Sequence, residues 1–244
     1  MIDIVASIAL TALAVLLPAL FIIASPVAWA TRRRLGFTLL LWFALVTALA
    51  AAGFFTATNG GTAAIGAAVV MPVIAGLIAF RRSAALKSLA SETPLALLVA
   101  VHAGRLLGVF FLLLYAEARL PPTFALTAGW GDIGVAAAAP LVAWAIHRRT
   151  AGWRGFALTW NTLGFADLVL AVTLGVGSAV DSPVRFIYEA ASSGTISSLP
   201  WLLIPGFLVP LYLLTHLAIF SRLLRRSAHP GNVRLSGATF APRM

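Results

Sequence analysis

The chain of 244 residues contains no cysteine and only one lysine, Lys87. The absence of cysteine excludes disulfides, iron–sulfur clusters, thiol nucleophiles, cysteine-ligated zinc and haem attached through C-x-x-C-H. The single lysine falls in a polar stretch between two apolar runs, which excludes a retinal Schiff base inside a helix. The P-loop, G-x-S-x-G, H-E-x-x-H and G-x-G-x-x-G motifs are also absent. The sequence therefore assigns no catalytic residue, no metal site and no enzymatic activity.

Charged residues are scarce as well, at 10% of the chain, whereas 61% of the residues are hydrophobic and the mean hydropathy is +1.00. A typical soluble domain is about half apolar and about a quarter charged. Too little polar surface remains to cover a soluble globule. The composition therefore predicts an integral membrane protein whose main partner is the lipid bilayer.

Seven apolar runs are long enough to cross a bilayer, which takes about 20 residues in a helix. We expect spans at residues 4–30, 36–58, 60–80, 94–117, 123–146, 156–180 and 200–223. The predicted fold class is all-α, a polytopic seven-helix bundle over residues 1–226. The tail 227–244 contains Pro, Gly and polar residues without helical periodicity, so we expect it to be disordered.

The basic residues are distributed unevenly between the two sides of the predicted membrane. Only Arg119 and Arg185 fall on one side and Arg105 lies inside a span, whereas every other arginine and the lysine fall on the opposite side. The positive-inside rule makes that basic side cytoplasmic, with the N-terminus outside and the C-terminus inside. This distribution accounts for the net charge of +10 without a nucleic-acid partner. We expect a multi-pass protein of the bacterial inner membrane.

Ionisable and amide side chains inside the predicted spans are few and are confined to the last four. A buried charge costs at least about 2.5–3.5 kcal/mol on insertion scales, so such residues usually face the bundle interior and mark a site. The deep residues singled out are His102, Arg105, Asp132, Asn161, Asp167 and His216, with Trp130 beside Asp132.

Arg105 is predicted to lie level with Asp167 and within reach of Asp132, at a rise of about 1.5 Å per residue. We expect these three residues, Asn161 and Trp130 to form a polar site. The preferred interpretation is binding or transport of a small anionic or protonatable solute, with Arg105 as anchor and the aspartates as counter-ions or proton carriers. The alternative is an ion-pair network that only holds helices together, as in a structural or accessory subunit.

His102 and His216 have matched predicted depths on two different helices. Two such histidines are the axial ligands of haem b in membrane cytochromes, so a haem redox protein is a further alternative. Arg105 would then meet a haem propionate. A hydrogen-bonded helix contact is the competing interpretation of the same pair.

The octapeptide GWGDIGVA (residues 129–136) has a near copy, GFADLVLA (164–171), in the next predicted span. Consecutive spans run in opposite directions, so this is either an inverted repeat, as in many transporters, or a chance match in an Ala/Gly/Leu-rich chain. The stretches GWGDIGVA, WNTLGFADLVLA and IPGFLVPLYLLTHL resemble those of uncharacterised bacterial polytopic membrane proteins. The resemblance covers about the C-terminal half, implies a multi-pass membrane fold and carries no activity.

Overall fold

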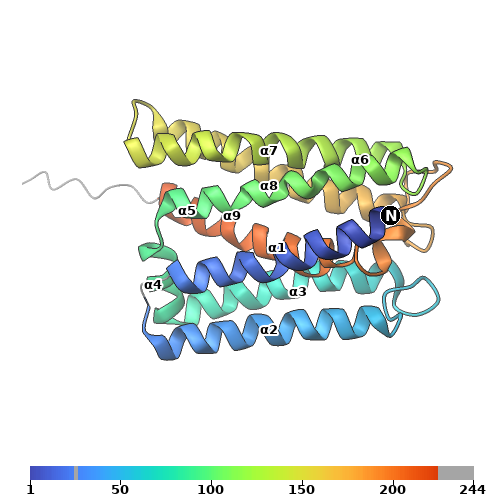
Figure 1. Cartoon of the computed structure of the whole chain (residues 1–244), viewed down its shortest axis with the longest axis horizontal. Coiled ribbons are helices and arrows are strands. Elements are labelled where there is room, and N and C mark those ends of the chain that lie inside the picture. Colours follow the sequence, from blue (N-terminus) through green and yellow to red (C-terminus); the bar gives the residue numbers. More distant parts are fainter. Residues whose placement is uncertain (25–26, 225–244) are drawn as a thin grey trace, which may run out of the picture.

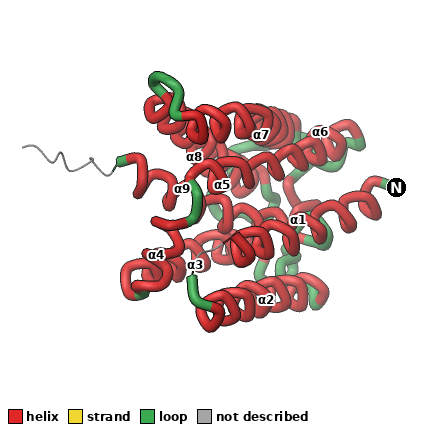
Figure 2. The backbone as a smooth tube through the Cα atoms, turned by 60° about the vertical axis from the view of Figure 1, so that its left-hand side comes forward, coloured by secondary structure: helices red, strands yellow, loops and turns green. Residues whose placement is uncertain are grey.

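The computed structural model of the chain describes residues 1–24 and 27–224, and these residues form helices and loops without any strand. Figures 1 and 2 show the long helices lying side by side, with α2 and α7 at opposite edges of the bundle. In chain order, the helical elements are α1 (Ile2–Ala24), α2 (Trp29–Ala51), α3 (Gly61–Arg82), α4 (Ala84–Glu92), α5 (Leu95–Ala100), the 3₁₀ segment η1 (Val101–Gly108), α6 (Val109–Ala116), α7 (Pro122–Arg148), α8 (Trp153–Ser178), the 3₁₀ turn η2 (Ser193–Ser197), the π segment η3 (Ile204–Leu208) and α9 (Val209–Leu223).

Seven helical stretches of the described chain are long and apolar enough to cross a membrane. They are Ile2–Ala24, Trp29–Ala51, Gly61–Arg82, Leu95–Ala116, Pro122–Arg148, Trp153–Ser178 and Ile204–Leu223. The prediction of an all-helical chain with seven membrane-length helices is therefore confirmed for the described residues. The predicted disordered tail, 227–244, lies outside them.

The first two helices begin and end earlier than the apolar runs at 4–30 and 36–58. α1 ends at Ala24, and α2 already begins at Trp29, after Ala28 in an extended conformation. The span predicted at 36–58 ends too late because Phe54 and Phe55 are apolar but lie outside the helix. The backbone turns at Gly53, whose φ of +71° is the left-handed conformation that ends helices. Phe55 then packs into the protein core rather than against lipid.

Two of the membrane-length helical stretches contain an irregular segment. The fourth stretch changes from α5 to the 3₁₀ segment η1 and back to α6, and 3₁₀ runs longer than three or four residues are uncommon. The seventh stretch starts with the π segment η3, and Pro205 and Pro210 each remove a backbone donor there. η1 packs against α7 and α1, and η3 packs against α3, α2 and α1, so neighbouring helices cover both irregular segments.

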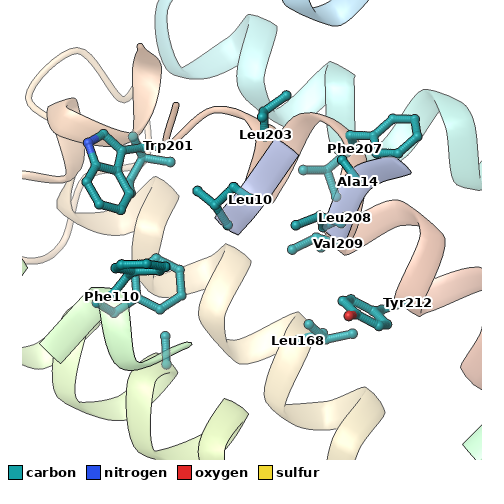
Figure 3. Close-up of a cluster of buried hydrophobic side chains, with 14 of the residues drawn as sticks. Leu10, Ala14, Phe110, Leu168, Trp201, Leu203, Phe207, Leu208, Val209 and Tyr212 are labelled. Atoms are coloured by element: carbon teal, nitrogen blue, oxygen red, sulfur yellow. The ribbon is translucent and has the colours of Figure 1, made fainter. Parts of the chain in front are cut away.

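The packed core lies among the last four stretches and α1. Leu10 of α1 is fully buried, together with Leu114 of α6, Trp201, and Phe207 of η3. Figure 3 shows Leu10 and Ala14 of α1 inserted among side chains of the C-terminal half. By contrast, only 11% of the apolar window of α2 and 6% of that of α3 is buried, so the other described residues leave most of the apolar surface of these two helices uncovered.

The long connection between α8 and η3 is tied to several helix starts at one end of the bundle. Asp181 accepts hydrogen bonds from Thr62 N at 2.6 Å and Thr62 Oγ1 at 2.8 Å, at the N-terminus of α3. Gly61, with φ of +56°, allows this approach, because a Cβ there would overlap the Asp181 carboxylate. Burial alone would raise the pKa of Asp181, but the hydrogen bonds from Thr62 outweigh it and hold the pKa below its usual value.

Replacing Asp181→Ala removes the acceptor that caps α3 and should lower the free energy of unfolding by about 0.5–2 kcal/mol, as for other N-terminal caps. Because the folded pKa of Asp181 is lowered, this contribution is present above the unfolded value of 3.8 and is lost as pH falls through the folded value. Thermal melts of detergent-purified protein at neutral and acidic pH measure it.

The control is Glu117→Ala, whose exposed carboxylate bonds only Arg119 among the described residues. Equal melting temperatures for Asp181→Ala and Glu117→Ala at neutral pH would contradict the capping role.

Candidate functional site

Arg105 of η1 lies at the centre of a buried polar cluster and its side chain is only 1% exposed. Its Nε donates to Asp132 Oδ1 of α7 at 2.6 Å, and its Nη2 donates to Asp167 Oδ2 of α8. Its Nη1 donates to the carbonyl oxygen of Gly164 at 3.0 Å and lies 3.3 Å from His216 Nε2 of α9. One guanidinium therefore joins four of the membrane-length helical stretches.

Glycines make room for the polar side chains of the cluster. At four positions, a Cβ added to glycine would come within 3 Å of a side-chain atom of a polar residue on another helix, closer than real Cβ atoms approach. The pairs are Gly104 with Tyr212, Gly108 with Asp132, Gly131 with Asp167 and Gly164 with His216. These glycines thus lie where the polar groups need space, and they set how closely the helices approach.

His216 is held in one orientation by Asn161 of α8. His216 Nδ1 lies 2.8 Å from Asn161 Oδ1, and Asn161 Nδ2 donates to the backbone oxygen of His216 at 3.2 Å. An arginine nitrogen only donates, so His216 Nε2 accepts from Arg105 and the ring proton lies on Nδ1, which donates to Asn161. In this arrangement His216 is an uncharged member of the cluster.

His102 lies next to His216 but makes a different set of contacts. Its Nε2 is 3.0 Å from Thr215 Oγ1, which donates its own proton to the Tyr212 carbonyl oxygen, so His102 Nε2 donates to Thr215. His102 Nδ1 is buried and has no hydrogen-bond partner among the described residues. Trp160 packs edge-on against the His102 ring, with centroids 5.3 Å apart.

The two histidines do not fit the haem alternative. A bis-histidine haem needs a flat macrocycle between two imidazole nitrogens, but the ring centroids of His102 and His216 are 4.1 Å apart, so the rings touch. Both nitrogens of His216, and Nε2 of His102, also have protein partners. The competing interpretation, a packed helix contact, describes this pair.

Trp130 is the one predicted site residue that the structure does not bring into the cluster. It is 62% exposed, on the outer surface of α7, although it precedes Gly131 and Asp132 in the chain. Adjacent residues on a helix point about 100° apart, so sequence proximity to Asp132 does not place an indole beside it. Tyr212, which the sequence did not single out as a site residue, lies at the cluster instead, against Gly104.

Two cavities meet at Asp132. The larger, of about 230 Å³, lies between α3, α8 and η3–α9 and has mainly apolar walls, including Val69, Phe124 and Leu168. The smaller, of about 30 Å³, lies between α1, η1 and α9 and is lined by Tyr212 and Arg105. Asp132 belongs to the walls of both, and Asp167 belongs to neither.

A family described as a domain of unknown function (DUF8737) matches residues 62–224. The chain belongs to this family. The DUF8737 match runs from α3 to the end of α9, so it contains the whole Arg105 cluster and most of the residues lining the larger cavity, and leaves α1 and α2 outside. It also contains the three stretches on which the resemblance to polytopic membrane proteins rests. No curated protein and no solved structure matches the chain.

Replacing Gly131→Ala places a methyl group on the Asp167 carboxylate and should cost about 1–3 kcal/mol of stability, as overpacking does in other cores. Gly134→Ala, on the same helix, is the matched control, because a Cβ at this position meets nothing within 4 Å. The control should be neutral or stabilising by up to about 1 kcal/mol through helix propensity.

Thermal melts of the two variants in the same detergent test this pair. An equal loss of stability in both variants would show that the close approach of α7 and α8 at Gly131 does not contribute to stability.

Proposed function

We propose that this chain is an integral membrane protein that binds or transports a small protonatable solute and exchanges a proton at the Asp132–Asp167 pair. The observation that carries the proposal is the charge of the cluster. Two carboxylates share one guanidinium, so the cluster has one negative charge more than its arginine balances.

Among the residues that the structure describes, no neighbouring group supplies the missing positive charge. The titratable side chains around the two carboxyls are Arg105 on η1, Tyr212 and His216 on α9, and His102 behind His216. His216 accepts from Arg105 and is therefore uncharged. Because an unbalanced charge within a membrane span is costly, the cluster takes up a proton or binds a cation.

An anionic solute anchored by Arg105 is less well supported. The guanidinium already donates to two carboxylates, a backbone carbonyl and an imidazole nitrogen. A solute anion would have to displace one of the aspartates and bring further negative charge to a cluster that already has an excess. Of the two kinds of solute, we therefore retain the protonatable one in the proposal.

The orientation is part of this proposal. Basic residues gather at the end of the bundle where α4 lies, at the left in Figure 1, and include Arg82 ending α3, Arg148 ending α7 and Arg222 near the end of α9. Arg119 and Arg185 lie toward the opposite end. Under the positive-inside rule the α4 end is cytoplasmic, as expected for a protein of a bacterial inner membrane.

The presence of an exchangeable proton on the Asp132–Asp167 pair is tested by infrared difference spectroscopy. The purified chain in lipid nanodiscs is titrated with acid and base. The wild type should show a protonated carboxyl band that disappears as pH rises. Asp132→Asn and Asp167→Asn should each abolish it, because one remaining carboxylate then balances one guanidinium. Glu117→Gln, which changes an exposed carboxylate outside the spans, is the control and should leave the band unchanged.

A cluster that only holds helices together makes the opposite prediction. It would show no titrating band in the wild type, or a band that survives in both asparagine variants. Arg105→Gln should lower the melting temperature under either role, since removing one partner of a buried ion pair costs about 3–5 kcal/mol. That variant therefore reports on packing and does not decide the function.

A further inference from the structure

The larger cavity runs from the polar end loops to the charged cluster. Thr62, Asp181 and Ser193 lie at one end, where the α8–η3 connection covers the start of α3. Asp132 lies at the other end, about 15 Å along α7 from its first residue at a rise of 1.5 Å per residue. Between the two ends the walls are apolar. The cavity thus has a long apolar body and a carboxylate at its deep end.

Asp132 and Asp167 have different positions relative to this cavity. Of the two carboxylate oxygens of Asp132, only Oδ1 accepts a hydrogen bond from a described residue, and the donor is Arg105 Nε. Oδ2 of Asp132 is therefore free to accept a hydrogen bond from a ligand. Asp167 bonds Arg105 and lines neither cavity. Asp132 is therefore the carboxylate that a ligand meets, while Asp167 keeps Arg105 paired.

A second observation also points to a ligand or water at this place. The Tyr212 hydroxyl is buried and has no hydrogen-bond partner among the described residues, although buried polar groups nearly always have one. Tyr212 lines the small cavity on the other side of Asp132. A volume of about 30 Å³ holds one or two water molecules, which could accept a proton that leaves Asp132.

We infer that the larger cavity binds a small lipophilic amine, whose apolar part fills the cavity and whose ammonium group bonds Asp132 in place of the exchangeable proton. The excess negative charge selects a cation, and the apolar walls select a hydrophobic body. An apolar cavity of about 150 Å³ holds benzene, so about 230 Å³ suits a single aromatic ring with a short aminoalkyl chain. The inference rests on the proposed function, since it uses the same carboxyl pair.

Binding and proton release are coupled in this scheme. The protonated carboxyl gives its proton to water and becomes a carboxylate, while the ammonium group stays protonated and forms the new ion pair. One proton leaves for each amine bound, and the charge of the cluster is unchanged. Such an exchange is the elementary step of an amine–proton antiporter.

The test uses phenethylamine as the probe, with the full chain in nanodiscs and isothermal titration in two buffers of different ionisation enthalpy. We expect saturable binding of phenethylamine with release of about one proton per site. Phenethyl alcohol has the same shape without the charge and should bind at least about tenfold more weakly, the ratio that 1.4 kcal/mol represents. Phenylacetate, which carries the opposite charge, should not bind.

The cavity is tested by a matched pair of glycine variants. Gly66 of α3 lines the larger cavity, and a Cβ there meets nothing within 4 Å, so the side chain of Gly66→Leu begins in open space and adds bulk at the cavity wall. Gly134 of α7 has the same open surroundings but does not line either cavity, so Gly134→Leu is the control. Gly66→Leu should weaken phenethylamine binding at least about tenfold and leave the infrared carboxyl titration intact, whereas Gly134→Leu should change neither.

The results separate this inference from the function on which it rests. Unchanged binding in Gly66→Leu, equal binding of phenethyl alcohol, or binding without proton release would overturn the amine site. No phenethylamine binding in a wild type whose carboxyl band still titrates would also overturn it, while the proton-exchanging pair stands. A wild type without a titrating carboxyl would remove the proposed function itself.

Discussion

The bundle depends on neutralising one guanidinium far from either end of its helices. Arg105 cannot be deprotonated in a protein, so carboxylates must come to it, and Asp132 and Asp167 do so from two different helices. Because two carboxylates rather than one pair with Arg105, the cluster has an excess of one negative charge. The proposed proton exchange rests on that excess, which a simple ion pair would lack.

The backbone around the cluster is arranged to permit this contact. Gly108 and Gly131 each leave room for an aspartate side chain, and a methyl group at either position would overlap it. The 3₁₀ segment η1 presents Arg105 to α7, α8 and α9 and presents His102 to α9. Pro205 in the π segment η3 and Pro210 in α9 each remove a backbone donor from the seventh stretch. Irregular helices are tolerated in a membrane when neighbouring helices cover them, and here the covered region is the polar site.

The sequence predicted much of this arrangement, and its errors have identifiable causes. Hydropathy located seven membrane-length helices but placed α2 too far along the chain, because Phe54 and Phe55 are apolar loop residues. Helical rise placed Arg105 near both aspartates. It also placed the two histidines at one level, but depth says nothing of the lateral distance, and the rings touch where a haem would need a gap.

The sequence by itself determined the membrane class, the number of long apolar helices and the short list of deep polar residues, because hydrophobic composition and the cost of buried charge act through each segment alone. The tertiary structure decided which of those residues meet. It turned Trp130 to the surface, brought Tyr212 to the cluster, and placed Asp132 rather than Asp167 on the cavity wall. These outcomes depend on how each helix is rotated about its axis and on which neighbour it packs against, and packing between distant segments sets both.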